Sequence, residues 1–169
     1  MNPGRRAALP DLIVALEDMP PEGLERPLNL GPEALAALVA GDGEEPPSLI
    51  TALTGTLRLR RLGARLEVRG SFRVEAAVAC DRCLAPASAV LAGEIEESLP
   101  LAAAGRPEEA DEDVLIVTDG RVDLGGLLAE SFWLAWPYRF LCRPDCAGLC
   151  PTCGADLNQG ACGCPPAAS

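Results

Sequence analysis

The residues of this chain best suited to chemistry are eight cysteines that fall into four close pairs. The pairs have the spacings C-x2-C, C-x3-C, C-x2-C and C-x-C, and the chain contains no histidine. Eight thiolates suffice for two tetrahedral sites of four sulfurs each, and such short spacings are typical of these sites. We therefore predict that the protein binds one or two Zn²⁺ ions. The expected ligands are Cys80, Cys83, Cys142, Cys146, Cys150, Cys153, Cys162 and Cys164.

Disulfide bonds and dithiol redox chemistry are the other uses of paired cysteines. The N-terminal segment lacks the uninterrupted apolar core of a secretory signal, and no later segment approaches the ~20 apolar residues of a membrane span. We therefore expect a cytoplasmic protein without membrane association, in which thiols stay reduced. Asp81 and Glu75 lie near the first cysteine pair and are expected to raise a thiol pKa there, which disfavours a reactive thiolate.

The sequence leaves open which cysteines share an ion. A local partition groups the last four cysteines around one ion and the first four around another. A crossed partition joins the two C-x2-C pairs instead. Loop closure favours the local partition by only ~2 kcal/mol, which is small beside the ~10–16 kcal/mol available from structural zinc. Cys162 and Cys164 are one residue apart, which also leaves open a site with fewer sulfurs.

The charge of the chain is strongly negative but unevenly spread. The formal net charge is −11, which disfavours non-specific nucleic-acid binding and suits a basic protein partner. Residues 58–82 nevertheless contain seven of the 14 basic residues. This stripe is either a solvated sheet face with cross-strand pairs to glutamates, or a docking face for RNA phosphates or a partner. The contact residues expected on the second reading are Arg58, Arg60, Arg65, Arg69, Arg73 and Arg82.

Alternation of polar and apolar residues predicts the sheet that must position these groups. Over residues 65–76 the even positions are apolar or glycine and the odd positions are polar, which is the period of a half-buried strand. Similar patterns predict strands over 49–60 and 87–99. The three strands would form an antiparallel meander with the first cysteine pair at a hairpin tip. A fourth short strand is expected at 114–118.

Helix signals complete the expected fold. One short helix is expected at 32–40, beginning with proline, and another from 124 to about 136, capped by Asp123 and ended by Pro137. An acidic linker is expected at 101–113. The predicted class is α+β, an antiparallel β-meander packed by one helix of the C-terminal half, with a cysteine-rich metal-binding tail. The expected regions are 1–47, an N-terminal extension with a short helix; 48–140, the sheet plus helix; and 141–169, the zinc-binding tail.

The second helix is expected to bury a stripe formed by Leu124, Leu127, Leu128, Ser131 and Leu134. Five of the six aromatic residues lie within 132–140, and helical geometry places Trp133 on the side of the helix away from this stripe. Either the cysteine-rich tail folds over this side chain, or Trp133 is an anchor that contacts a partner. We favour the first alternative because a large exposed indole is unusual on a monomer.

Three segments together resemble a known family. They are CDRCLAP at 80–86, VDL at 122–124 followed by Glu130 and Pro137, and LCRPDCAGLCPTCGADLN at 141–158. They resemble the YceD-like family, whose members are known as large ribosomal RNA subunit accumulation proteins. The resemblance covers roughly residues 48–164. It implies a role in the accumulation of large-subunit ribosomal RNA, with that RNA or a pre-ribosomal particle as partner. A basic large-subunit ribosomal protein is a further expected partner.

No catalytic constellation is evident, because the chain has neither histidine nor lysine and no glycine loop suited to phosphates. We therefore expect a ribosome biogenesis factor that is not an enzyme and that contains structural zinc. The alternatives are a rubredoxin-like iron or iron–sulfur electron carrier, since four thiolates also accept iron, and a redox switch at Cys80 and Cys83. Visible colour would distinguish iron from zinc.

Overall fold

The computed structural model describes residues 9–40, 47–103, 115–118 and 120–165. It contains a mostly antiparallel sheet and two α-helices, which confirms the predicted class. The expected acidic linker begins inside a strand, since 101–103 belong to β5, and its remainder lies outside the described residues. The strands are β1 (Ile13–Ala15), β2 (Leu24–Leu30), β3 (Leu53–Leu62), β4 (Arg65–Ala79), β5 (Pro86–Ala103), β6 (Leu115–Thr118) and β7 (Arg121–Asp123), and the helices are α1 (Pro32–Val39) and α2 (Gly125–Ala135).

The described strands form one sheet in the order β1-β7-β6-β5-β4-β3-β2. Neighbouring strands are antiparallel except β5 and β6, which pair in parallel. The predicted three-stranded meander is its centre, where the turn between β3 and β4 contains Gly63 at φ +60°. A residue without a Cβ adopts this left-handed conformation without steric cost. Pairing of Arg65 with Pro100 and of Ala79 with Pro86 makes β4 and β5 a long hairpin.

The N-terminal part of the chain belongs to this sheet. We expected 1–47 as an extension, but β2 pairs with β3 along its whole length and α1 lies in the core through Leu35 and Leu38. The Arg26 guanidinium of β2 donates hydrogen bonds to the backbone oxygens of Asp11 (3.0 Å) and Ile13 (3.2 Å). The sheet therefore curls enough for the Arg26 side chain to bridge its two edge strands, and the core inside it is shared by residues 9–40 and the meander.

Helix α2 packs on the core face of the sheet. Asp123, the predicted cap, accepts a hydrogen bond from the Gly125 N–H (2.7 Å) just before the helix, but the N-cap position itself is occupied by Leu124. Leu128 and Phe132 are buried, but Leu134, which we expected in the same stripe, is 81% exposed. The reason is that α2 crosses β5 near Gly93, where Ala135 faces the sheet and Leu134 points away from it.

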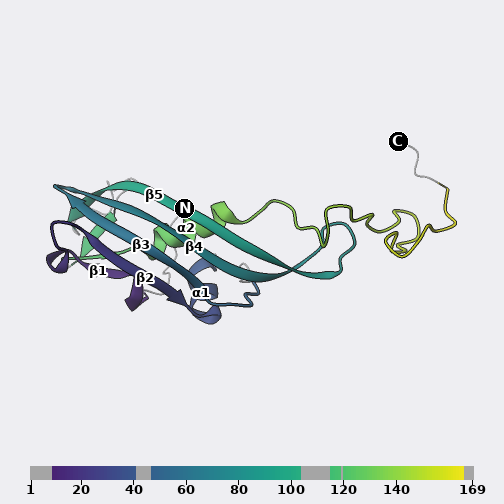
Figure 1. Ribbon diagram of the computed structural model, residues 1–169, viewed down its shortest axis with the longest axis horizontal. Coiled ribbons are helices and arrows are strands. Elements are labelled where there is room, and N and C mark those ends of the chain that lie inside the picture. Colours follow the sequence, from purple (N-terminus) through teal and green to yellow (C-terminus); the bar gives the residue numbers. More distant parts are fainter. Residues whose placement is uncertain (1–8, 41–46, 104–114, 119, 166–169) are drawn as a thin grey trace.

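The β4–β5 hairpin extends beyond the other strands, and the C-terminal segment after α2 runs alongside it and continues past its tip (Figure 1). The hairpin thus separates the core from the cysteine-rich part of the molecule. Among the helices that the structure describes, none is both long and apolar enough to cross a membrane.

Candidate metal centres

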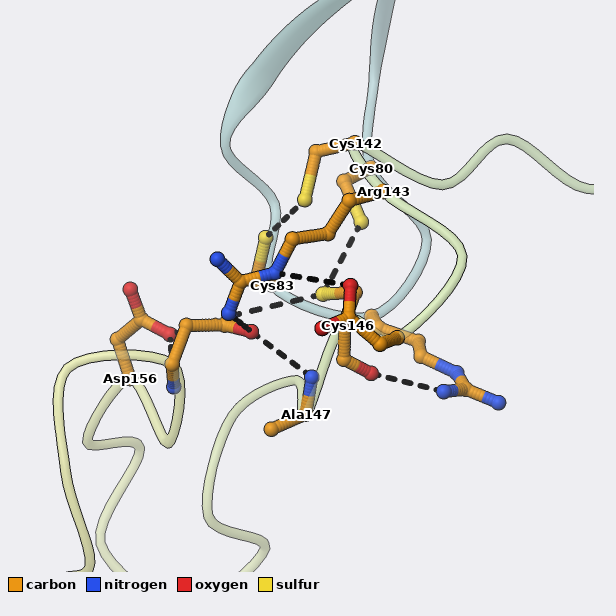
Figure 2. Close-up of polar contacts among 10 residues, drawn as sticks. Cys80, Cys83, Cys142, Arg143, Cys146, Ala147 and Asp156 are labelled. Atoms are coloured by element: carbon orange, nitrogen blue, oxygen red, sulfur yellow. Dashed lines mark hydrogen bonds and ion pairs between the residues drawn. The ribbon is translucent and has the colours of Figure 1, made fainter.

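Four cysteines from two distant segments meet at the tip of the β4–β5 hairpin; we call this group the hairpin centre. Its sulfurs all lie within 4.8 Å of one another. The Sγ atoms of Cys80 and Cys146 are 3.7 Å apart and those of Cys83 and Cys142 are 3.6 Å apart (Figure 2). Metal–sulfur bonds of about 2.3 Å in a tetrahedron separate the sulfurs by about 3.8 Å. The four sulfurs therefore fit a single tetrahedral metal ion.

A tight turn presents the first two ligands of the hairpin centre. The Leu84 N–H donates to the Cys80 carbonyl (2.8 Å) and the Cys80 N–H donates to the Ala85 carbonyl (2.9 Å). Leu84 has φ +59°, and it is the only non-glycine residue with positive φ in the described part of the chain. This conformation costs a branched side chain roughly 1–2 kcal/mol, so the surrounding contacts must hold the turn in place.

Two clamps hold the segment after α2 against this turn. Asp81 and Phe140 exchange hydrogen bonds, in which the Asp81 N–H donates to the Phe140 carbonyl (2.9 Å) and the Phe140 N–H donates to Asp81 Oδ2 (2.5 Å). The Arg82 guanidinium donates to the Cys146 carbonyl (2.8 Å), and the Arg82 carbonyl accepts from the Leu149 N–H (3.0 Å). Arg82 lies at the hairpin tip, apart from the arginines of the sheet, and it positions the C-terminal segment. Its contact with RNA or a partner stays a prediction.

The remaining four cysteines form the tail centre, and their sulfurs also lie within 4.8 Å of one another. The Gly154 N–H donates to the Cys150 carbonyl (2.8 Å), and the Cys150 N–H donates to the Ala155 carbonyl (2.8 Å). Gly154 has φ +73°, as expected for the glycine of a CPTCG turn. Only Cys150 is buried, and Cys153 is exposed. The tail centre is therefore the more open of the two.

The two groups correspond to the local partition of the cysteines. Each C-x2-C turn has its own partner pair, namely the C-x3-C pair for the hairpin centre and the C-x-C pair for the tail centre. Cys162 and Cys164 both point to the tail centre although only one residue separates them. None of the eight cysteines forms a disulfide bond in the structure.

Backbone hydrogen bonds favour one thiolate in each centre. The N–H groups of Cys142 and Cys83 lower the pKa of Cys80 to about 6. The N–H groups of Cys153 and Thr152 do the same for Cys150, whose pKa is also about 6. Our expectation of a raised thiol pKa is therefore wrong for Cys80, because backbone N–H donors lower its pKa.

A second thiol in each centre is held protonated by the sulfurs around it. Contact with Cys146 raises the pKa of Cys142 to about 12. Contact with Cys153 raises the pKa of Cys164 to about 11. A cation that replaces these protons would relieve the repulsion among the four sulfurs, because coordination deprotonates a thiol. Both centres have the donor chemistry of a site that binds metal and releases protons.

The sheet arginines lie apart from the metal centres. Strand register and exposure place five of them on the open face of β3 and β4, where Arg58 lies directly opposite Arg69. Arg58 pairs with Glu25 (2.9 Å) and Arg69 pairs with Glu96 (2.9 Å). A depression of about 480 Å³ at this face is lined by both signs of charge. The arginines are Arg58, Arg60, Arg65, Arg69 and Arg73, and the glutamates among them are Glu25, Glu67, Glu75, Glu94 and Glu96.

In the described part of the chain, Trp133 packs against α1 rather than under the cysteine-rich tail. Its indole N–H donates to the Val39 carbonyl (3.0 Å), and its ring packs against Phe132 and Trp136 at centroid distances of 5.3 and 5.5 Å. The side chain remains 40% exposed. We expected the tail to fold over it; the correct cover is the last turn of α1, which ends at Val39 beside α2.

Sequence reasoning missed the polar residues that join the two centres. Asn158 lies in the loop between Cys153 and Cys162, yet its Nδ2 donates to the Cys146 Sγ of the hairpin centre (3.5 Å). The available signal was an asparagine that follows the CPTCG turn inside a cysteine loop. The sequence does not show that Cys146 lies beside that loop, so it could not link Asn158 to the hairpin centre.

Comparison with known proteins gives one family. A family model described as large ribosomal RNA subunit accumulation protein YceD matches residues 68–168, which include the cysteines of both the hairpin centre and the tail centre. Uncharacterized proteins of Mycobacterium bovis and Mycobacterium tuberculosis are 31% identical over 102 residues, or 60% of this chain and 49% of theirs. One from Mycobacterium leprae is 26% identical over the same length. The chain thus matches about half the length of these relatives. No solved structure matches it.

Proposed function

Because this chain belongs to the YceD family of large ribosomal RNA subunit accumulation proteins, we propose that it is a cytoplasmic, non-enzymatic factor that supports large-subunit ribosomal RNA accumulation. The observation that carries the proposal is the extent of the family match, which runs from β4 through both cysteine centres. The matched segment thus contains the part of the fold that presents both candidate metal centres.

Zn²⁺ is the ion proposed for both centres. The donors are sulfur alone, and four sulfurs in each centre leave no open position, as in structural zinc sites. Such an ion would join the hairpin tip to the segment after α2 without redox chemistry of its own. Elemental analysis of protein purified without chelator should give two zinc ions per chain and no visible colour. Stoichiometric iron with absorption in the visible range would instead favour the electron-carrier alternative.

Large-subunit ribosomal RNA, free or in a pre-ribosomal particle, is the proposed partner, and the open sheet face is the proposed contact. Five arginines on one face offer planar donors to phosphates. The glutamates among them oppose indiscriminate binding of polyanions, so a contact here would depend on the spacing of phosphates. The same glutamates and the net charge of −11 would also accept a basic large-subunit ribosomal protein.

Depletion of the protein in its own organism tests the role. The expected result is a lower ratio of large-subunit to small-subunit ribosomal RNA, together with sedimentation of the protein with large-subunit precursors. Normal ribosomal RNA after depletion, with the protein confined to ribosome-free fractions, would contradict the proposal.

Rescue with variants tests the contact face. Replacing Arg60, Arg65 and Arg73 together with glutamate should abolish co-sedimentation while leaving the metal content unchanged. Arg139→Glu is the matched control, because Arg139 is exposed but lies outside the sheet. RNA crosslinks confined to another surface would place the contact elsewhere, and purification with one basic ribosomal protein in the absence of RNA would favour the protein partner.

A further inference from the structure

The side chain of Asn158 belongs to the loop of one metal centre and contacts a ligand of the other. Its loop runs from Cys153 to Cys162, two ligands of the tail centre. Its amide Nδ2 donates to the Sγ of Cys146, which is a buried ligand of the hairpin centre, at 3.5 Å. A hydrogen bond from a neighbouring side chain to a metal ligand orients that ligand and tunes the metal affinity of the site.

The orientation of the Asn158 amide is determined by its other partners. Its Oδ1 accepts hydrogen bonds from the Ala147 N–H (2.8 Å) and from Arg143 Nη2 (2.8 Å). Because the oxygen faces two donors, the amide nitrogen must face the sulfur. The same nitrogen also donates to Asp156 Oδ1 (2.7 Å). Figure 2 shows Arg143, Ala147 and Asp156 gathered beside Cys146. The amide therefore uses both of its donors and both lone pairs of its oxygen.

The backbone of the tail centre holds Asn158 in this position. The Leu157 N–H donates to the Gly148 carbonyl (2.9 Å), and Leu149 forms an antiparallel bridge with Asp156. The Asn158 N–H also donates to Asp156 Oδ1 (3.0 Å). When the tail centre is closed by an ion, both ends of the loop are tethered. When it is open, the Cys162 end of the loop loses that tether, and Asn158 loses part of the restraint that aims it at Cys146.

We propose that Asn158 couples the two centres, so that a metal ion in the tail centre raises the metal affinity of the hairpin centre. The proposal rests on metal binding at both centres and is independent of any contact with ribosomal RNA. Loss of a hydrogen bond to a ligand typically costs 10–100-fold in metal affinity. The coupling factor is therefore expected to be about 10–100, and the hairpin centre must strengthen the tail centre by the same factor.

The test measures this factor with Co²⁺ as the probe, by visible absorption in competition with a chelator, on the full-length chain. A hairpin-only protein carries Cys153→Ser and Cys164→Ser, and a tail-only protein carries Cys83→Ser and Cys142→Ser. The coupling factor is the two-ion binding constant of the intact chain divided by the product of the two single-centre constants. It should be about 10–100 for the wild type and near 1 for Asn158→Asp, which keeps the oxygen acceptor but removes the N–H donors.

Controls separate coupling from general damage. Asn158→Ala should also bring the factor near 1, which excludes the added charge of aspartate as the cause. Gln159→Ala is the matched control, because Gln159 is exposed and, among the described residues, its side chain hydrogen-bonds only to Asp156 Oδ2 (3.2 Å) and to no cysteine; it should retain the wild-type factor. Far-UV circular dichroism checks that each variant keeps the sheet.

Two results would overturn the coupling. One is a factor near 1 in the wild type, and the other is a factor unchanged in both Asn158 variants. If a single-centre protein does not fold, ¹¹³Cd NMR of the intact chain replaces it. The hairpin resonances must then shift in Asn158→Ala and stay unshifted in Gln159→Ala, and the reverse pattern overturns the proposal. Intact coupling together with normal ribosomal RNA after depletion would contradict the proposed cellular role alone.

Discussion

The hairpin centre and the tail centre use the same turn but join different parts of the chain. In both turns the residue after the second cysteine donates to the carbonyl of the first cysteine, at 2.8 Å, and the first cysteine donates to the carbonyl of a following alanine. The residue after the second cysteine is Leu84 in one turn and Gly154 in the other. The hairpin centre joins segments about 60 residues apart, as in the pair Cys83 and Cys142, whereas the tail centre joins neighbouring turns.

This difference shows what supports each turn. Leu84 keeps a left-handed conformation because the hairpin turn is clamped from outside, through Asp81 to Phe140 and through Arg82 to Cys146. The tail turn has fewer such supports and uses glycine, which has no steric penalty at φ +73°. The hairpin centre therefore depends on tertiary contacts, and the tail centre depends mainly on local backbone geometry.

Loss of one cysteine ligand should produce the largest difference in behaviour between the two centres. Cys80→Ser should release the segment after α2 from the hairpin, because a structural zinc site contributes about 10–16 kcal/mol of binding free energy. Trypsin should then cleave after Arg139, which is exposed just before the hairpin centre. Cys164→Ser is the matched change in the tail centre and should leave Arg139 protected. Equal cleavage of both variants would show that the two centres do not differ in this way.

Acid should weaken both centres alike. Cys142 and Cys164, with pKa values raised to about 12 and 11, are protonated at neutral pH without metal and must lose that proton on binding. Affinity should therefore fall about tenfold per pH unit for each displaced proton as pH decreases. The fall should steepen below about pH 6, where Cys80 and Cys150 also become protonated. Chelator competition at several pH values measures it, and a pH-independent affinity in either centre would contradict the assignment of its ligands.

Exchange of the residues at the fifth position of the turns should have a smaller effect. Gly154→Ala has open space for its Cβ, so its cost comes from the backbone alone and should be roughly 1–2 kcal/mol. Leu84→Gly should be neutral or stabilise the protein by up to about 1 kcal/mol, since it relieves the same strain. Urea unfolding of the metal-loaded variants measures both changes. A marked loss of stability in Leu84→Gly would indicate that the leucine side chain itself supports the hairpin centre.

The smallest expected effect concerns the Arg82 clamp. Arg82→Gln removes the guanidinium bond to the Cys146 carbonyl and should cost about 0.5–1.5 kcal/mol. Chelator should then remove metal faster from the hairpin centre while the tail centre is unaffected. If instead RNA association decreased with metal release unchanged, Arg82 would belong with the sheet arginines as a contact residue.

Several elements were predictable because their signals are local. The alternation over 65–76 identified β4, and Asp123 with Pro137 bounded α2 to within two residues. Strand β2 also alternates, but it contains Pro27, and proline disfavours a strand assignment. The structure resolves this conflict by placing β2 at the end of the sheet order, where proline is tolerated because an edge strand has unpaired N–H groups.

Other features depend on segments that meet only in the folded chain. The cover of Trp133 comes from Val39, which is 94 residues away, and no sequence pattern links the two. The curl of the sheet depends on Arg26 reaching the backbone of Asp11 and Ile13. The contact between Asn158 and Cys146 could be recognised only after the ligands had been assigned to their centres.

The sequence alone determined the type of the candidate ligands and the shape of the CPTCG turn, because residues within about five positions of one another are governed by local backbone geometry. The hairpin turn also needed the tertiary clamps that hold Leu84 in its left-handed conformation. The tertiary structure decided which pairs share a centre and which residues lie behind them. Loop closure costs grow only logarithmically with length, so neither partition was excluded by spacing. The long β4–β5 hairpin determines which pairs share a centre, because it places Cys80 and Cys83 where the segment after α2 places Cys142 and Cys146.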